Sequence, residues 1–299
     1  MRHKRGDKIN GWLVVDKPEG MGSTQVVNLT RRLFNAQKNG HGGTLDPFAT
    51  GVLPIAFGEA TKMIDFITDG DKEYEFTLCF GSETDSADCT GNIIASGGKI
   101  PNKKDICAVL SDFCGILRQT PPAFSAIKIN GQRAYDLARR GEKVEIPERE
   151  VTIYDLQLLN VYEDCADFKV KCSKGTYVRS LGRDIARKLG SFGHLRRLRR
   201  TRCGIFTLDD TILLENLQNM MYISHALLPL ETSLRDIAVM AVSEVEAAKL
   251  RQGQALSPQG RVGKIPLGSW AAAMCDGCLI ALVRMEERRI SPVRVFNLT

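Results

Sequence analysis

Strict alternation of apolar and polar side chains over residues 74–80 limits most strongly how this chain can fold. Tyr74, Phe76, Leu78 and Phe80 would share one face of an extended strand, and the intervening residues would share the other. Residues 168–173, with the sequence FKVKCS, alternate in the same way. The sequence therefore predicts at least two amphipathic strands that bury one apolar face.

Helical patterns lie between the strand patterns. Val26, Leu29 and Leu33 recur at helical spacing. The stretch TYVRSLGRDIARKLG contains a second helix pattern, with Leu181, Ile185 and Leu189 in register and Gly190 as its stop. Because strand and helix patterns alternate along the chain, the fold class should be α/β or α+β.

The size of the chain suggests about two domains. It has 299 residues, 43% of them hydrophobic, which is enough to bury a large core. Near residue 240 the pattern changes: Ser243 and Glu246 form a capping box, and short β-like segments with frequent Gly and Pro follow. We therefore predict one domain over 1–240 and a small β-rich domain over 241–299.

Several classes of protein are disfavoured by composition. No apolar run approaches the roughly 20 residues that span a bilayer, and the basic N-terminus precedes only a short apolar patch, so we expect a soluble, cytoplasmic protein. Nine scattered cysteines suggest reduced thiols rather than a disulfide framework. Cys275 and Cys278 form one CxxC without a second pair, and the four histidines lack ligand spacing, so no metal is expected.

Positive charge is concentrated in one segment. Residues 185–202 carry seven Lys or Arg and no acid, whereas the whole chain has a net charge of +6. The arginines of this segment lack acids four positions away, which would form ordinary surface pairs on a helix. A solvated helix face is one interpretation. Guanidinium groups at this density also suit phosphate oxygens, and we favour a nucleic acid partner.

Two loops allow both a structural and a functional interpretation. Asp46, in GHGGTLDPFATGVLP, is either a turn former before Pro47 or a catalytic carboxylate on a stiffened loop. Residues 128–147 contain a turn at Asn130-Gly131 and a predicted short helix around 132–140. This cationic excursion is either a mobile arm that orders on a ligand or a surface connection between strands.

The motifs taken together resemble the TruB family of tRNA pseudouridine synthases. GHGGTLDPFATGVLP is similar to the family signature. The other matching motifs, in chain order, are DKPEGMGS, KEYEF, SAIKINGQRAYDLARRGEKVEIPER, GTYVRSLGRDIA and HLRRLRRTRCGIF. These motifs cover about 200 residues in the family's order, and the tail is similar to its PUA-like domain. Gly42 stands where many members have Thr.

The resemblance implies an α+β fold with a mixed, mostly antiparallel central sheet flanked by helices, a thumb-like insertion at about 122–146 and a PUA-like C-terminal domain. It implies an isomerase that converts uridine 55 in the T-loop of tRNA to pseudouridine. No electrons or groups are exchanged with a second molecule, so no cofactor is expected. The expected partner is the T-arm stem-loop of tRNA, bound by a monomer without an obligatory protein partner.

The same resemblance assigns Asp46 as the nucleophile, which attacks either C1′ of the ribose or C6 of the base. Arg179 would pair with this carboxylate and, as nearby cations do, lower its pKa. The alternative for Arg179 is an ordinary surface arginine at a helix start. Tyr177 lies two residues before it, and on an extended segment both would point to one face.

Four aromatic or apolar residues would surround the nucleotide. Tyr74 would lie against the uracil and help remove the C5 proton, although it could simply be a core aromatic. Tyr177 would help enclose the base, and Leu198 would form an apolar wall or anchor its helix. His41 would fill the space left by the flipped base. Arm residues Arg133, Arg139, Arg140 and Lys143 would lie near phosphates.

Two other functions are compatible with these motifs. An RNA-folding chaperone would use the same basic surfaces without the chemistry. A guide-RNA-dependent synthase acting on ribosomal RNA would share the catalytic residues, but such relatives tend to have Lys-Val-Thr-Gly after Asp-Pro, where this chain has Phe-Ala-Thr-Gly. We therefore favour a stand-alone enzyme acting on tRNA.

Overall fold

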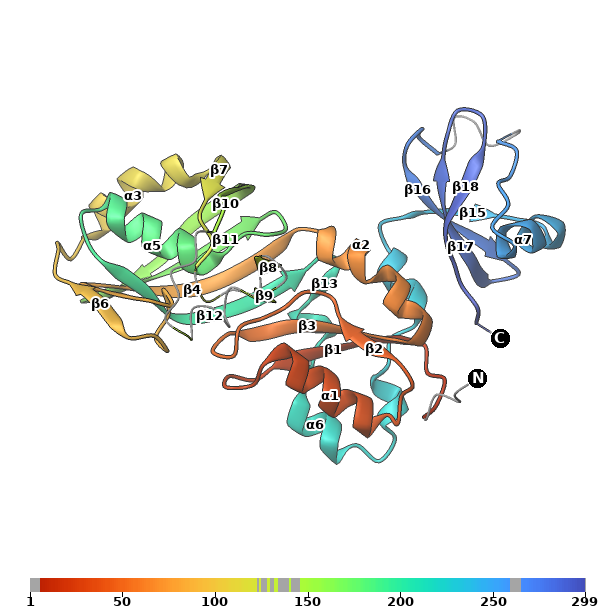
Figure 1. The fold of residues 1–299 in the computed structure, drawn as a ribbon, viewed down its shortest axis with the longest axis horizontal. Coiled ribbons are helices and arrows are strands. Elements are labelled where there is room, and N and C mark those ends of the chain that lie inside the picture. Colours follow the sequence, from red (N-terminus) through yellow and green to blue (C-terminus); the bar gives the residue numbers. More distant parts are fainter. Residues whose placement is uncertain are drawn as a thin grey trace.

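One ten-stranded sheet organises most of the chain. The computed structural model describes residues 6–122, 124, 128–129, 132–133, 140, 146–258 and 265–298. The main path of the sheet is β14-β1-β3-β12-β4-β11-β10-β7, with β2 added on β3 and β13 on β12 (Figure 1). Its strands are β1 (Gly11–Lys17), β2 (Asn39–His41), β3 (Thr50–Phe57), β4 (Lys72–Phe80), β7 (Gly115–Gln119), β10 (Arg149–Val161), β11 (Cys165–Cys172), β12 (Gly193–Cys203), β13 (Phe206–Thr207) and β14 (Ile212–Leu213).

The sheet is mixed and mostly antiparallel, as predicted. Only the pairs β1–β14 and β3–β12 are parallel among its described strands. Strand β4 lies between β12 and β11, and its four alternating apolar residues, Tyr74, Phe76, Leu78 and Phe80, all enter the main hydrophobic core. The period-two pattern thus identified a central strand of the α+β fold.

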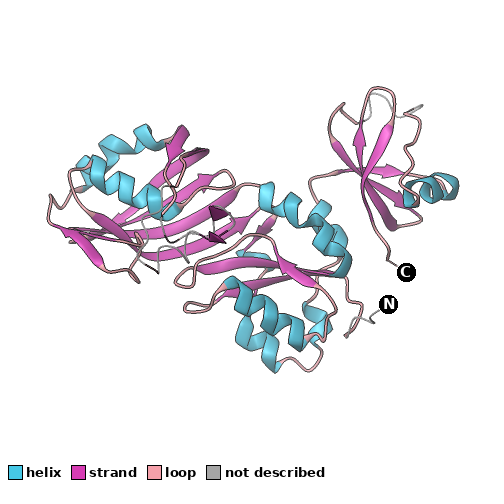
Figure 2. Cartoon of the chain, in the orientation of Figure 1, coloured by secondary structure: helices cyan, strands magenta, loops and turns pink. Residues whose placement is uncertain are grey.

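Helices cover the sheet at its two ends (Figure 2). Helices α1 (Ser23–Leu33) and α6 (Leu214–Asn219) lie over the β1–β3 end, and α3 (Lys103–Val109) and α5 (Val178–Lys188) over the other. Helix α2 (Ile64–Asp69) follows the 3-10 turn η1 (Gly58–Met63) and precedes β4. Gly182 lets α5 approach β12 closely, because a Cβ there would lie 2.6 Å from a methyl carbon of Leu195.

The arginine-rich segment is a strand, not a helix. Residues 193–203 form β12 in the middle of the sheet, so the helical interpretations of this run and of Leu198 were wrong. Ion-pair partners come from other strands of the sheet rather than from four positions along the chain: Arg199 pairs with Asp16 of β1 at 2.7 Å, and Arg202 pairs with Glu73 of β4 at 3.1 Å. Leu198 is a buried strand residue.

A smaller sheet follows the large one. Strands β15 (Ala238–Ala241), β16 (Trp270–Cys275), β17 (Cys278–Met285) and β18 (Ile290–Val295) pair in that order and pack with helix α7 (Glu244–Arg251). This sheet begins three residues before 241, where the composition placed the second domain. Leu282 and Phe296 enter a core shared with Trp12 of β1, so the two parts pack on each other.

Two further expectations concern cysteines and the arm. Cys79 and Cys165 oppose each other across β4 and β11 and form a disulfide, so the expectation of reduced thiols was wrong for this pair, whereas the other seven cysteines are free. Residues 128–129 and 132–133 pair as the short strands β8 and β9, so the predicted arm helix does not begin at 132. Its remainder, with Arg139 and Lys143, lies outside the described residues, as does the side chain of Arg133; Arg140 is exposed.

Five small elements complete the described chain: a hairpin of β5 (Ser82–Thr84) and β6 (Ile93–Ser96), and the 3-10 turns η2 (Leu110–Phe113), η3 (Leu208–Asp210), η4 (Ile223–Ala226) and η5 (Leu230–Leu234). The hairpin lies beside β12 and begins the segment that reaches the site described below. None of the described helices combines the length and apolar character needed to cross a membrane.

Candidate active site

A cavity of about 750 Å³ lies between the two parts of the chain, but a second cavity, of about 500 Å³, contains the predicted chemistry. The second cavity is lined by the loop after β2, by β4 and β12, and by the segment that enters α5. Five of the six predicted site residues line it: Asp46, Tyr74, Tyr177, Arg179 and Leu198. Four segments far apart in sequence therefore converge on one hollow.

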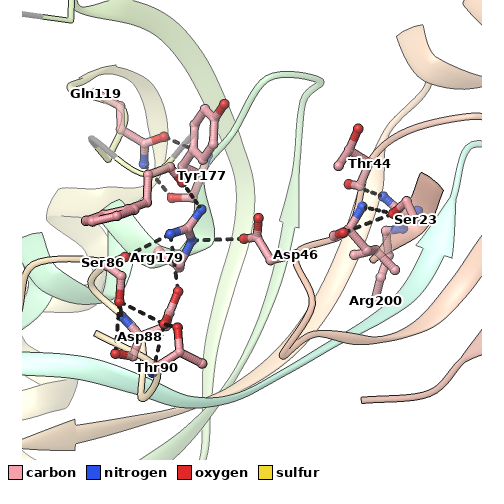
Figure 3. A network of polar contacts seen from close by, with 12 residues as sticks. Ser23, Thr44, Asp46, Ser86, Asp88, Thr90, Gln119, Tyr177, Arg179 and Arg200 are labelled. Carbon is pink, nitrogen blue, oxygen red and sulfur yellow. Dashed lines mark hydrogen bonds and ion pairs between the residues drawn. The ribbon is translucent and has the colours of Figure 1, made fainter. Parts of the chain in front are cut away.

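Asp46 and Arg179 form an ion pair at this cavity. The Nε atom of Arg179 lies 2.9 Å from a carboxylate oxygen of Asp46. Figure 3 shows the Asp46 side chain pointing from its loop toward the guanidinium. The Asp46 side chain keeps 33% of its exposure and that of Arg179 only 3%, so the carboxylate faces the cavity while the cation is embedded.

Arg179 is fixed by three further acceptors. Its Nη1 donates to the backbone oxygen of Ser86 at 2.8 Å and lies 3.2 Å from a carboxylate oxygen of Asp88, and its Nη2 donates to the backbone oxygen of Phe124 at 2.8 Å. Asp88 is itself buried and accepts hydrogen bonds from Ser86 and Thr90. Asp88 was not predicted from the sequence, because it lies outside the recognised motifs and its neighbours in sequence do not indicate a carboxylate that reaches α5.

The helix, not an extended segment, brings Arg179 to the cavity. Val178 begins α5, so Arg179 lies in the first helical turn and Tyr177 immediately precedes it. The prediction that Tyr177 and Arg179 share one face of an extended segment was therefore wrong, because Arg179 is helical. Both residues nevertheless line the cavity. Arg179 is also not the surface arginine of the alternative interpretation.

The electrostatics of Asp46 differ from the expectation. Burial raises the pKa of Asp46 above its ordinary value, Arg179 opposes this shift, and the nearby Asp88 adds to it. We had expected the cation to lower the pKa overall. Desolvation of the carboxylate therefore outweighs the attraction of Arg179.

Lys17, of the DKPEGMGS motif, holds the Asp46 loop in place, a role that was not predicted from the sequence. This side chain is fully buried at the end of β1, and its ammonium donates to the backbone oxygens of Pro18, Met21 and Pro47. Pro47 directly follows Asp46. Burial lowers the pKa of Lys17 to about 8, while the charge of Asp46 opposes the shift. The loop is also tied to α1 because Ser23 Oγ accepts from Leu45 N at 2.8 Å.

The remaining walls are aromatic and apolar. Tyr74 is 9% exposed, and burial raises the pKa of its phenol. Gln119 holds the backbone of Tyr177 by two hydrogen bonds, of 2.7 and 3.0 Å, and the Arg149 guanidinium lies 4.6 Å from the centre of the Tyr177 ring. Leu198 of β12 is buried and lines the same cavity. These groups suit a flat ring with polar edges.

His41 lies outside the lining of this cavity. It ends β2, is partly buried, and its Nδ1 has no hydrogen-bond partner among the described residues. Burial lowers the pKa of His41, and Arg200 adds to this effect. His41 therefore lies at the end of β2, just before the Asp46 loop, but not in the cavity.

Outside the cavity, Glu244, Cys275 and Asp276 place potential metal-ligand atoms within 4.8 Å of one another. Both acids are exposed to solvent, and Cys275 Sγ already donates to Glu244 at 3.6 Å. This group is remote in the fold from the Asp46 loop, since it belongs to α7 and the β16–β17 hairpin.

Comparison with known proteins identifies the family. Residues 31–178 match the TruB family pseudouridylate synthase N-terminal domain, residues 179–237 the tRNA pseudouridylate synthase B C-terminal domain, and residues 238–297 the tRNA pseudouridine synthase II C-terminal domain. Proteins called tRNA pseudouridine synthase B from Caulobacter vibrioides and Bradyrhizobium diazoefficiens are each 46% identical over 308 residues. These alignments cover the whole of this chain and 99% and 89% of the relatives.

Solved structures agree at the level of the fold. A Cbf5-Nop10-Gar1 complex contains a chain with a TM-score of 0.74 and 27% identity, covering 96% of this chain and 84% of that one. A structure of an H/ACA RNP bound to a substrate RNA containing 2′-deoxyuridine gives a TM-score of 0.75 at 23% identity, covering 99% and 91%. With the family matches spanning nearly its full length, the chain belongs to the TruB family of pseudouridylate synthases, which are isomerases.

Proposed function

We propose that this protein converts uridine 55 in the T-loop of tRNA to pseudouridine. In this reaction the N1–C1′ bond breaks, the uracil turns, and C5 joins C1′. The Asp46–Arg179 pair at the edge of a pyrimidine-sized hollow is the observation that carries the proposal. The tRNA substrate is supported by relatives named tRNA pseudouridine synthase B, which align over their full length.

The cavity suits a nucleotide that has left its stack. Its volume lies within the range of about 300–1,000 Å³ that is usual for small-ligand sites. A base within a folded loop cannot be reached in place, and its extrusion costs a few kcal/mol. Tyr74, Tyr177 and Leu198 offer contacts to the faces of the base, which offset part of this cost.

Asp46 acts as the nucleophile in this proposal. A carboxylate can add covalently to C1′ of the ribose or to C6 of the base and then leave again. Arg179 holds the carboxylate in place with one nitrogen, and its other contacts prevent it from following the substrate. Tyr74 accepts the C5 proton in the last step.

The RNA backbone is bound mainly outside the cavity. Arg196 and Arg197 of β12 are exposed and have no carboxylate within 4.0 Å among the described residues, in contrast to Arg199 and Arg202. These two guanidinium groups are free for phosphate oxygens. His41, with its unpartnered ring nitrogen, is the candidate to occupy the position that the flipped base leaves.

A map of modified uridines tests the function. The purified protein is incubated with unmodified tRNA, and pseudouridines are located by mass or primer extension. A single modification at the T-loop uridine is expected, and an isolated T-arm hairpin should also react. Modification at other uridines, or a requirement for guide RNA or added proteins, would contradict the proposed substrate and stand-alone action.

A further inference from the structure

Arg200 is a buried cation whose role the site described above does not explain. It lies in the middle of β12 and is 1% exposed. Among the described residues, no carboxylate lies within 4.0 Å of its guanidinium, although Arg199 and Arg202 of the same strand both have one. A buried charge without a counter-charge is costly unless other groups compensate for it.

Hydrogen bonds connect this guanidinium to both ends of the Asp46 loop. Its Nη2 donates to the backbone oxygen of Gly43 at 3.0 Å and its Nη1 to that of Thr44 at 3.4 Å, just before Asp46. Its Nε donates to the backbone oxygen of Val52 at 2.8 Å, just after the loop. One side chain thus joins the two ends of the segment that carries the nucleophile.

The backbone is shaped to accept this arrangement. Gly51 lies opposite Arg200 where β3 and β12 pair, and it has a φ of +100°. A Cβ on Gly51 would lie 2.2 Å from the Arg200 backbone oxygen, a distance that no side chain tolerates. The loop therefore closes against this arginine only because position 51 is glycine.

The same side chain lies beside Tyr74. Arg200 and Tyr74 are direct partners where β12 and β4 pair, so their side chains are neighbours on one face of the sheet, and the positive charge of Arg200 opposes the rise in the pKa of Tyr74. Both residues line the cavity. Burial disfavours the charged form of this phenol, and the positive charge of Arg200 offsets part of that cost.

We propose that Arg200 is a positioning residue that fixes the Asp46 loop and balances the charge of Tyr74 while its phenol is deprotonated during the reaction. This inference rests on the proposed function. When the N1–C1′ bond breaks, the phenol of Tyr74 gives its proton to N1 of the uracil. After C5 has joined C1′, the Tyr74 oxygen takes the proton from C5, and the C5–H electron pair forms the C5–C6 double bond. This pair displaces either the Asp46–C6 bond, which frees the carboxylate, or the π pair of the C6–N1 double bond, which returns to N1.

A kinetic cycle tests the link between the two residues. Single-turnover rates of pseudouridine formation are measured for the unaltered protein, Arg200→Gln, Tyr74→Phe and the double variant. General-base catalysis is worth about 10²–10⁴-fold, and Arg200→Gln should lose a part of this. In the Tyr74→Phe background the same change should cost much less. If the rate losses of the two single variants simply multiply in the double variant, Arg200 and Tyr74 act independently, and the proposed link between them is overturned.

An isotope effect separates this role from a structural one. With tRNA carrying 5-deuterouridine, Arg200→Gln should show a primary isotope effect larger than that of the unaltered protein, because proton removal becomes limiting. An arginine that only shaped the loop would slow the attack by Asp46 instead, and the isotope effect would not rise. That result would overturn the proposal.

Two further variants guard against a folding artefact. Arg200→Lys keeps the cation and should recover part of the lost rate; if Arg200→Gln does not fold, the same cycle and isotope measurement are made with Arg200→Lys. Arg202→Gln, on the same strand but paired with Glu73 outside the cavity, should leave the rate and the isotope effect unchanged. Turnover by the unaltered protein tests the proposed function separately, so the two failures are distinguishable.

Discussion

Replacing Arg179 with Met removes the cation on which two carboxylates depend. Asp88 would bear most of the cost, because its side chain is only 4% exposed, whereas Asp46 retains 33% and is partly screened by water. Removing one partner of a buried ion pair typically costs about 3–5 kcal/mol. We therefore expect Arg179→Met to lower the free energy of unfolding by about 3–5 kcal/mol.

Urea unfolding at constant pH measures this change. The control is Lys188→Met on the same helix, where an ion pair with Asp112 is 54% and 51% exposed and should be worth about 0–1 kcal/mol. Adding Asp88→Asn to Arg179→Met should restore stability, because it removes the more deeply buried charge.

The reasoning fails if Arg179→Met costs no more than Lys188→Met. It also fails if Asp88→Asn worsens the Arg179→Met variant, because the cost would then not arise from an unpaired carboxylate.

Three further predictions concern pH, salt and packing. The rate of pseudouridine formation should fall as pH is lowered through the pKa of Asp46, and the midpoint should lie above the ordinary value of 3.8 because burial raises that pKa. A pH–rate profile measured in single turnover checks this. A midpoint at or below 3.8 would contradict it. The raised pKa also means that the charged carboxylate weakens the fold, so the contribution of Asp46 to stability should fall as pH rises through its folded value. The double variant Arg196→Ala and Arg197→Ala should flatten the slope of log tRNA affinity against log salt concentration. Arg199→Ala should change that slope less, because Arg199 is already paired with Asp16. Equal slopes for the double variant and Arg199→Ala would refute this distinction. Leu198→Ala should cost about 2–5 kcal/mol in urea unfolding, as for other buried leucines, and a neutral effect would show that the side chain is not packed as described.

Local patterns predicted the elements that depend on neighbours in sequence. The alternation around Tyr74 identified β4, because period two follows directly from an extended backbone. The spacing of Leu181 and Ile185 identified α5 for the equivalent reason. The resemblance to the family then selected the residues that the structure gathers at one cavity.

The errors arose where the partner of a side chain is distant in sequence. Arg199 looked uncompensated because its acid, Asp16, is 183 positions away on another strand. Asp88 carries no local pattern that distinguishes it from a surface charge, yet it is bound to Arg179. Lys17 belongs to the DKPEGMGS motif, but the motif did not show that its ammonium holds the Asp46 loop. The sign of the pKa shift of Asp46 depends on how deeply the carboxylate is buried, which no motif encodes.

Single-turnover conversion of unmodified tRNA by Asp46→Asn, measured beside the unaltered protein, tests the central claim most directly. The amide keeps the size of the side chain but cannot act as the nucleophile. We predict that the unaltered protein forms pseudouridine at the T-loop uridine, and that Asp46→Asn binds tRNA within a few-fold of the same affinity yet forms none. Pseudouridine formation by Asp46→Asn at a comparable rate would contradict the account.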